Sequence, residues 1–478
     1  MAGITSYGMY IPFNRLKRKT IGEAFGKKFS AGEKAVACYD EDSFTMGLSA
    51  AMKCQTVVGA AKLDALFFAS TTATSTEKQS AAHIASVLDI EGELRTADFA
   101  GSLRAGTSAI LSALDIAKQG GNVLAVASDA RLGAASGKFE ETFGDGAAAI
   151  RFGNKAVMAQ FVDSYSVAHD FQDIWRLSGE KYPHFFDEKY ALEMGCIPFV
   201  TEAVAGLFKK TGLSASQITK VVLDAADLHN SSIVLSKCGF VPAQAQPQLI
   251  TEFGYSGVAY APLLLIDALE HAKVGDMILY ISYGEGSDAI LFKVLKESKA
   301  GAGCGRKYYT ICKKNTLSYE KYLGWKKILA TEPPRRPVPT RSSLPDFYRK
   351  RAKNLALCGS VCKVCGTPQY PPARVCVRCH AVDQMKAYKL LGRKVSLASF
   401  TFDYIAFSED SPNIVAVADF EGGGRIFTNL MDGDKDKLEI GMPLEMTYRK
   451  SFTADGIITY AWKCVPAVRI PKEGITYE

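Results

Sequence analysis

Four cysteines near residue 370 carry the spacing with the clearest chemical meaning in this sequence. Cys362 and Cys365 form one C-x-x-C pair, Cys376 and Cys379 form a second, and residues 366–375 separate the two pairs. A C-x-x-C turn directs two sulfurs to the same side, and two such turns complete a tetrahedral thiolate site for zinc. Four protein ligands leave no open position on the metal, so the spacing predicts a structural zinc ribbon rather than a catalytic centre.

A second stretch, residues 97–121, has the composition of a strand end, a tight turn and a buried helix. Apolar residues recur at helical spacing from Leu103 onward, and Gly120 and Gly121 would end the helix. The N-terminus of such a helix suits an activated nucleophile or an anion, because unpaired backbone N–H groups gather there. The residue at this tip is Leu103, which has no nucleophilic atom. Ser102 is the nearest hydroxyl, and we expect it to cap the helix, since no histidine is placed to activate it.

Length and composition set the class of protein. A chain of 478 residues is too long for one ordinary core, so two or more domains are expected. The hydrophobic content of 47% and charged content of 22% are typical of globular proteins, and we expect no membrane span and no signal peptide. Only four of the twelve cysteines have metal spacing, so we expect reduced cysteines and a cytoplasmic protein.

The positive charge is unevenly distributed. Much of the net charge of +7 lies between Lys299 and Lys353. A basic segment of this kind could bind nucleic acid or the phosphates of a coenzyme. A solvated linker is the favoured interpretation, because no aromatic residues alternate with the basic ones as in a stacking platform. We therefore expect no nucleic-acid partner, and binding of coenzyme phosphates stays an open alternative.

The order of expected elements repeats between residues 1–160 and 161–295. In each half a buried helix is followed by a buried strand and a Gly-rich turn into another strand. The matching segments are NVLAVAS and FGDGAAAIRF in the first half, and MILYIS and YGEGSDAILF in the second. This repeat predicts an internal duplication, with two α/β halves packed back to back. A chance likeness of Gly-rich turns is the alternative.

The composition changes after residue 295. Residues 296–344 are basic and contain several prolines, which predicts a linker with one amphipathic segment around 319–329. A helix and the zinc ribbon are expected over 345–386. From 387 to 478, five short alternating strands separated by glycine turns predict a small antiparallel barrel.

Several segments make nearly the whole chain similar to known families. Residues 1–330 resemble the hydroxymethylglutaryl-CoA synthase branch of the thiolase superfamily, of the archaeal type. The segments that carry this resemblance are GITSYGMYIP at 3–12, EKAVACYDEDSFTMGLSAA at 33–51, ADFAGSLRAGTSAI at 97–110, FGDGAAAIRFG at 143–153, DIWRLSGEKYP at 173–183 and SYGEGSDAILF at 282–292. PDFYRKRAKNLALCGSVCKVCG at 345–366 and YPPARVC at 370–376 resemble the zinc-ribbon and OB-fold proteins that accompany such thiolases.

This resemblance implies an α/β fold of the duplicated, five-layer thiolase type over 1–295, followed by a zinc ribbon and an antiparallel OB-fold barrel. It also implies that one chain fuses two proteins that usually assemble as separate subunits. The family's chemistry uses a Cys nucleophile, a His, an Asn and a Glu. These positions fall on Leu103, near Asp224, near Phe253 and near Thr71 in this sequence, so no acyl-enzyme is expected at this site.

Two functions of different classes follow from this resemblance. The first is a subunit of a multi-component complex that forms or cleaves carbon–carbon bonds in acyl-CoA, with this chain in a structural or CoA-binding role. The alternative is a Cys-independent aldolase or retro-aldolase acting on a CoA thioester, which needs only acid–base groups and an oxyanion site. Its candidate catalytic residues are Asp224, Tyr255 and Tyr283, although both tyrosines could be packing residues. Cys196 and Cys238 are expected to be buried apolar residues rather than replacement nucleophiles.

Ligands and partners follow from the same reasoning. We expect structural zinc at the four paired cysteines and a coenzyme A thioester as substrate or ligand. Because this fold normally continues its sheet across a two-fold axis, we expect a homodimer or a hetero-oligomer with an active thiolase-type subunit.

Overall fold

The computed structural model describes residues 1–28, 30–58, 62–224, 228–298, 305–314, 317–332 and 339–467. These residues form two compact units. The first contains Met1–Cys38, Asp42–Ala82 and Gly92–Ile328, and the second contains Tyr39–Glu41, His83–Glu91 and Leu329–Glu478. Parts of the expected linker, at 299–304, 315–316 and 333–338, and the end of the expected barrel, at 468–478, lie outside the described residues.

The described residues of the first half form seven strands and five helices. The strands are β1 (Gly3–Tyr10), β2 (Asn14–Lys17), β3 (Glu33–Val36), β4 (Ala65–Ala69), β5 (Arg95–Phe99), β6 (Val123–Asp129) and β7 (Gly146–Gly153). The helices are α1 (Arg18–Ala24), α2 (Ser43–Val58), α3 (Ser80–Val87), α4 (Ala105–Lys118) and α5 (Lys138–Thr142). Strand β4 is parallel to β5 and β6, whereas β7 is antiparallel to both β6 and β1.

The second half repeats this plan. Its strands are β8 (Ala159–Ala168), β9 (Ile174–Trp175), β10 (His184–Phe185), β11 (Lys220–Leu223), β12 (Met277–Gly284) and β13 (Gly286–Val294). Its helical segments are α6 (Glu188–Tyr190), η1 (Ala191–Cys196), α7 (Ile197–Thr211), η2 (Ala215–Gln217), α8 (Leu228–Lys237), η3 (Pro242–Gln244), α9 (Ile250–Phe253), η4 (Gly257–Ala259) and α10 (Tyr260–His271).

Strand pairing confirms the predicted duplication. In the second half β11 pairs with β12 in parallel. Strand β13 then pairs antiparallel with both β12 and β8. This order matches β4, β6, β7 and β1 in the first half. A short pairing of β1 with β8 joins the halves, so their strands form one mixed nine-stranded sheet rather than two separate ones.

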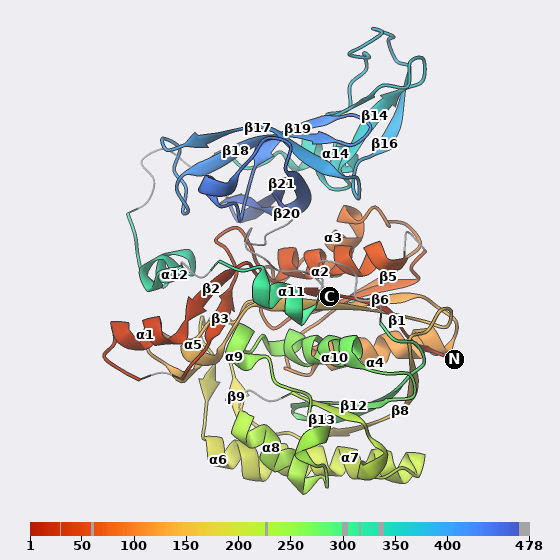
Figure 1. Cartoon of the computed structure of the whole chain (residues 1–478), viewed down its shortest axis with the longest axis vertical. Helices are drawn as coiled ribbons and strands as arrows, with labels where there is room; N and C mark the ends of the chain where they lie inside the picture. Colours follow the sequence, from red (N-terminus) through yellow and green to blue (C-terminus); the bar gives the residue numbers. More distant parts are fainter. Residues whose placement is uncertain are drawn as a thin grey trace. The chain divides into compact units, whose positions relative to one another are not determined.

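Helices α4 and α10 lie between the two sets of strands, with α2 covering the first set and α7 and α8 covering the second (Figure 1). This is the expected five-layer arrangement. The middle layer is rich in small residues because the backbones approach closely there. A Cβ atom on Gly106 of α4 would lie 2.5 Å from the carbonyl oxygen of Val258, ahead of α10, which a side chain cannot occupy.

One helical run among the described residues, Glu188–Thr211, is long and apolar enough to cross a membrane by length and composition alone. Its last part, α7, packs against β8 and β13. Val200, Ala203, Val204 and Leu207 of this helix are buried in the core beside the second set of strands. Core helices pass the same test, and this packing explains the apolar composition.

The first part of the segment expected to be a linker, 296–344, contains helices in this structure. Its helices are α11 (Arg306–Ile311) and α12 (Tyr319–Trp325), and residues up to Ile328 belong to the first unit. Tyr309 is 3% exposed and donates a hydrogen bond to the Met9 carbonyl at 2.6 Å, and Tyr322 is 1% exposed. Aromatic burial therefore outweighs the basic, proline-rich composition, and we propose that the linker begins after Ile328.

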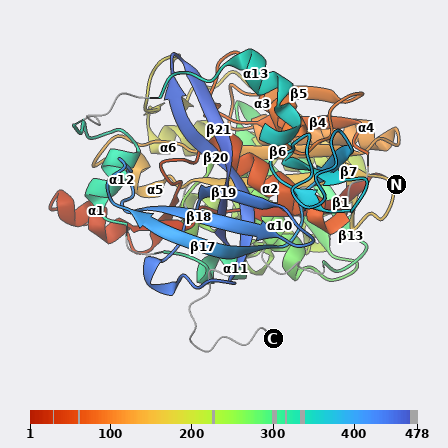
Figure 2. The ribbon, with the colours of Figure 1, turned by 90° about the horizontal axis from the view of Figure 1, so that it is seen from above.

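The second unit contains α13 (Leu344–Arg349), α14 (Arg351–Asn354), β14 (Cys358–Cys362), β15 (Pro368–Gln369) and β16 (Met385–Lys389), followed by the barrel. The barrel strands are β17 (Val395–Asp403), β18 (Asn413–Phe420), β19 (Arg425–Asn429), β20 (Pro443–Ala454) and β21 (Ile457–Pro466), with η5 (Lys435–Lys437) before β20. In Figure 2 the hairpin of β20 and β21 crosses the direction of β17 and β18. A bridge between Leu430 and Cys464 brings the β19 edge against β21, so the five predicted strands form the expected barrel.

Candidate active site

A cavity of about 740 Å³ opens in the first unit. It lies at the carboxyl ends of the parallel pairs β4–β6 and β11–β12, where α/β folds gather ligand-binding residues. Thr71 follows β4, Arg131 follows β6, Asp224 follows β11, and Tyr283 stands near the end of β12. The duplication thus brings equivalent strand ends from both halves to a single cavity.

All three candidate catalytic residues line this cavity: Asp224, Tyr255 and Tyr283. The backbone N–H of Asp224 donates to the Ile281 carbonyl at 3.0 Å, which fixes Asp224 beside β12. Tyr255 is held by its backbone N–H, which donates to the Thr142 carbonyl at 2.7 Å. The structure therefore brings together residues that are far apart in the sequence.

The position of Tyr255 depends on two glycines in facing loops. A Cβ atom on Gly144 would lie 1.8 Å from the carbonyl oxygen of Phe253, closer than any side chain could come. Gly254 adopts φ = +82°, which side chains rarely accept. Only glycine at both positions lets the two loops meet and places Tyr255 against Phe143, whose ring centroid lies 6.3 Å away.

Asp224 and Tyr255 form a buried acid–phenol pair. Each residue is 4% exposed, and the Tyr255 hydroxyl donates a hydrogen bond to the Asp224 carboxylate. Burial raises the pKa of Asp224 from 3.8 to about 7, opposed by this hydrogen bond and by the positive charge of Arg131. Burial also raises the pKa of Tyr255 well above its usual value. The Oδ1 atom of Asp224 is buried and has no hydrogen-bond partner among the described residues.

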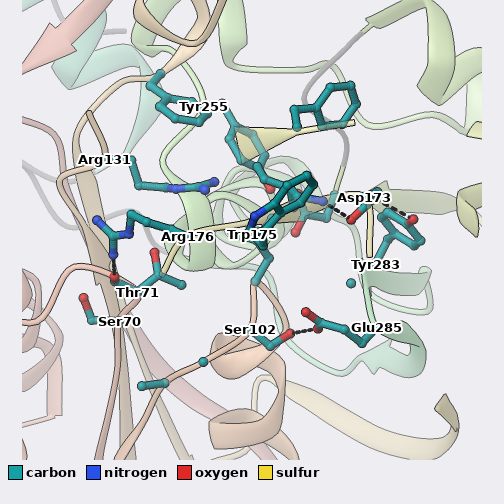
Figure 3. Close-up of a pocket in the computed structure, with 18 of the residues that line it drawn as sticks. Ser70, Thr71, Ser102, Arg131, Asp173, Trp175, Arg176, Tyr255, Tyr283 and Glu285 are labelled. Carbon is teal, nitrogen blue, oxygen red and sulfur yellow. Dashed lines mark hydrogen bonds between the residues drawn. The ribbon is translucent and has the colours of Figure 1, made fainter. Parts of the chain in front are cut away.

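Tyr283 has a different role, because its hydroxyl donates to Oδ2 of Asp173 at 2.7 Å (Figure 3). Asp173 also accepts a 2.6 Å hydrogen bond from the backbone N–H of Ile174. Burial raises the pKa of both Tyr283 and Asp173. Since this pair is already satisfied, Tyr283 is better placed to shape the cavity wall than to transfer protons.

Two arginines also reach the cavity. Arg131 extends into it with its guanidinium 4.5 Å from the ring centroid of Phe143, and Arg176 lies close by (Figure 3). Arg176 donates to the carbonyl of Thr71. Burial lowers the pKa of Arg131, and the neighbouring charge of Arg176 lowers it further, while Asp129 opposes both effects.

Leu103 lines the cavity and stands in the turn before α4. The helix itself begins at Ala105, with Arg104 as the cap residue, so the expectation that Ser102 caps the helix is wrong. Ser102 donates instead to Glu285, and its Oγ accepts from the backbone N–H of Arg104 at 3.1 Å (Figure 3).

The other positions that the resemblance singled out hold no substitute machinery. Thr71 lines the cavity, but its hydroxyl donates to Asp129 at 2.7 Å. Phe253 is a core residue, 3% exposed, outside the cavity lining. Cys196 is the only thiol among the described lining residues, and burial raises its pKa to about 12. Burial also raises the pKa of Cys238, which does not line the cavity.

The four cysteines of the ribbon meet at one point in the second unit. Their Sγ atoms all lie within 4.8 Å of one another, with 3.6 Å from Cys362 to Cys379 and 3.5 Å from Cys365 to Cys376. Zinc bound to four sulfurs at about 2.3 Å requires sulfur–sulfur distances of about 3.8 Å. The donor set and its geometry therefore fit a structural zinc ion.

Four residues that line the cavity were not predicted from the sequence: Asp173, Trp175, Arg131 and Arg176. Three of these lie in the DIWR segment at 173–176, which was noted for its resemblance but not for chemistry. The signal for Arg131 was its place directly after a buried strand. A search for charged residues one to three positions beyond each predicted strand would have found it.

Comparisons with known proteins cover both units. Residues 388–449 match the family model described as ChsH2, C-terminal OB-fold domain. The chain is 31% identical over 306 residues to the hydroxymethylglutaryl-CoA synthase of Aeropyrum pernix, covering 62% of this chain and 84% of that protein.

Solved structures of low sequence identity share the fold. A crystal structure of an HMG-CoA synthase complexed with CoA superimposes with a TM-score of 0.60 at 20% identity, covering 67% of this chain and 89% of that one. A structure of MvaS in complex with 3-hydroxy-3-methylglutaryl coenzyme A gives a TM-score of 0.60 at 17% identity, covering 71% of this chain and 94% of that one.

Proposed function

The chain belongs to the hydroxymethylglutaryl-CoA synthase family, and from this premise we propose that it catalyses an aldol or retro-aldol step on a CoA thioester without a covalent acyl-enzyme. The observation that carries this proposal is the buried Asp224–Tyr255 pair at the wall of a large cavity, whose described lining residues include no activated nucleophile. This favours the aldolase alternative over a purely structural role.

Acyl transfer through an enzyme thioester is not supported by the residues that line the cavity. Leucine at position 103 offers no nucleophile, and the thiol of Cys196 has a pKa of about 12. At pH 7 about one such thiol in 10⁵ is ionised, and the thiolate is the reactive form. A step that moves protons rather than acyl groups is compatible with the residues present.

An aldol cleavage requires one general base that removes the proton from the substrate hydroxyl. In the cleavage direction, Oδ1 of Asp224 takes the proton from the hydroxyl on the β carbon of a 3-hydroxyacyl-CoA. The bond between the α and β carbons breaks, and its electron pair moves into the thioester as an enolate. The β carbon leaves as a carbonyl compound, and the proton is delivered to the α carbon. Atoms and electrons balance without water, oxidant or metal.

The environment of Asp224 suits this proton transfer. A carboxyl group with a pKa of about 7 is present in both protonation states near neutral pH, which is the best compromise for a general acid–base catalyst. Tyr255 orients the carboxylate by donating to it, which leaves the unpartnered Oδ1 for the substrate hydroxyl. Tyr255 is therefore a positioning residue in this proposal.

Isotope exchange tests the proposal without knowledge of the acyl group. The protein is incubated with propionyl-CoA in D₂O, and deuterium at the α carbon is measured by mass spectrometry as a report of enolate formation. A second assay follows acyl-CoA release from a panel of 3-hydroxyacyl-CoA thioesters. We expect Asp224→Asn to lower both rates by about 10²–10⁴-fold.

A matched control uses Tyr280, a fully buried tyrosine outside the cavity lining whose hydroxyl lies 3.1 Å from that of Thr107. Tyr255→Phe should slow exchange at least tenfold, whereas Tyr280→Phe should not. Exchange that survives Asp224→Asn unchanged contradicts the proposal.

The second candidate function is a structural or CoA-binding subunit of a multi-component acyl-CoA complex. The loss of Cys, His, Asn and Glu at all four family positions favours it. Native purification followed by mass spectrometry would then find a thiolase-type partner, and acyl-CoA would bind this chain without any α-carbon exchange. Zinc at the ribbon and CoA thioester in the cavity are common to both candidates.

A further inference from the structure

Apolar side chains are exposed around the four-cysteine cluster of the ribbon. Val364 and Val377 lie inside the two C-x-x-C turns and are 66% and 70% exposed. Val375 and Val382 form an isolated bridge beside the second turn and are 45% and 57% exposed. We call these four valines the ribbon patch. A single exposed valine is common on protein surfaces, whereas four around one small cluster are typical of a contact surface.

The charge around the ribbon patch is positive. Residues 358–389 contain five lysines and arginines and one acidic residue, Asp383. Asp383 is already paired with Arg374 through two 2.7 Å contacts. Lys363 and Arg378 are exposed inside the C-x-x-C turns, beside the exposed valines. The ribbon patch therefore fits an apolar surface with a negative rim.

A surface of that kind lies in the same unit, on the loop between β17 and β18. Residues 403–412 contain three acidic residues and no lysine or arginine. Three large apolar side chains are exposed on this loop, and we call them the loop patch: Tyr404 (65%), Ile405 (82%) and Phe407 (61%). The loop patch and the ribbon patch are thus both apolar and opposite in charge.

The two patches lie at opposite ends of the barrel, so they do not cover each other within one chain. Pro368 of the ribbon is 3.0 Å from the Cβ position of Gly423, which lies in the turn between β18 and β19. Val395, the first residue of β17, pairs with Phe420 at this same end. Strand β17 then runs for nine residues to Asp403, which places the loop about 25 Å away. Figure 1 shows the ribbon strands β14 and β16 at one end of the second unit.

We propose that the ribbon patch of one chain binds the loop patch of a second copy, so that copies join head to tail. Because the two surfaces differ, the contact is heterologous, and each copy keeps one patch available for the next. Both patches are small, so the contact is weak and adds to the dimer expected through the first unit. The inference does not depend on the chemistry of the cavity.

Sedimentation of the full zinc-bound chain tests this contact. The parent chain should form larger species at about 100 µM than at about 1 µM, the range in which small interfaces associate. Raising NaCl from about 0.05 M to about 0.5 M should reduce this growth, because salt screens the opposite charges.

One variant in each patch should weaken the association at least about tenfold: Val377→Asp and Phe407→Asp. Val274→Asp is the matched control, because Val274 is 63% exposed in the first unit, outside both patches. It should assemble like the parent chain. Zinc content equal to that of the parent shows that the ribbon of Val377→Asp is folded. If zinc is lost, Val382→Asp, outside the C-x-x-C turns, takes its place.

Mixing the two variants separates a head-to-tail contact from other arrangements. An equal mixture of Val377→Asp and Phe407→Asp should form larger species than either variant alone. The intact loop patch of the first then meets the intact ribbon patch of the second.

Four outcomes would overturn the inference. The first two are a parent chain that does not grow with concentration, and growth that neither variant weakens. The third is a mixture that stays as small as its components while the parent grows, since each patch would then bind its own kind. The fourth is a different protein from the native source that binds the parent but not Val377→Asp, when the parent does not associate with itself.

Discussion

Replacing Asp224 by asparagine should stabilise the fold at alkaline pH while it removes activity. Asp224 is 4% exposed, and its Oδ1 atom has no hydrogen-bond partner among the described residues. Its ionised form is therefore poorly solvated in the folded protein. Asparagine has nearly the same shape, keeps an oxygen that accepts from the Tyr255 hydroxyl, and is neutral at every pH.

The size of the effect follows from the shift in pKa. Burial raises the pKa of Asp224 from 3.8 to about 7, and each unit is worth about 1.4 kcal/mol. Well below pH 3.8 the group is protonated in both the folded and the unfolded state, so it costs nothing. Burial of this carboxyl costs folding about 2 kcal/mol at pH 5, where the unfolded carboxyl is ionised and the folded one is still protonated. The cost is about 4 kcal/mol at pH 8, where the penalty is fully developed. Asp224→Asn should gain these amounts, with a difference that grows as the pH rises.

Urea unfolding at pH 5 and pH 8 measures the difference in stability between Asp224→Asn and the parent chain. Hydrogen exchange of peptides from β11 and β12 reports the unfolding of the first unit in these experiments. Asp288→Asn is the control, because Asp288 is 1% exposed but lies 2.7 Å from Arg104 in an ion pair. Breaking that pair should destabilise the protein by about 3–5 kcal/mol. A destabilised Asp224→Asn protein at pH 8, or a difference independent of pH, would refute the reasoning.

Three further predictions concern the metal, the nucleophile and the assembly. Elemental analysis should find one zinc per chain. Cys376→Ser should lose the zinc and destabilise only the second unit. The control Cys358→Ser alters a cysteine outside the cluster and should retain the zinc. After incubation with acyl-CoA, peptide mass spectrometry should find no acyl group on the parent chain. Leu103→Cys should not create synthase activity. Its new thiol should nevertheless react faster with iodoacetamide than free cysteine does, because it lies near the N-terminus of a helix. A mapped acyl group on Cys196 would contradict this. Sedimentation at micromolar concentration should give a dimer, and a monomer that gains no partner from its native source would count against it.

Much of the fold was predictable because it depends on local patterns. The five strands predicted between 387 and 478 are all present, since alternating residues and glycine turns are visible within a few positions. The duplicated halves were visible from repeated strand and turn segments. The burial of Tyr309 and Tyr322 was not predictable, because it depends on surfaces far away in the sequence.

The candidate site was only partly predictable. Asp224, Tyr255 and Tyr283 were expected to act together, and the structure places all three at one cavity. Their roles were not separable from the sequence. The free oxygen of Asp224 and the satisfied hydroxyl of Tyr283 differ only in the neighbours that tertiary contacts supply.

The sequence by itself determined the family, the four-cysteine ribbon, the barrel and the absence of a nucleophile at Leu103, because residue identity and spacing are enough for each. Only the tertiary structure decided which charges face the cavity. Arg131 and Arg176 come from segments that the sequence does not connect, and the pKa of Asp224 is set by loss of solvent around it. Desolvation and the convergence of distant charges are properties of the packed chain, which no local pattern encodes.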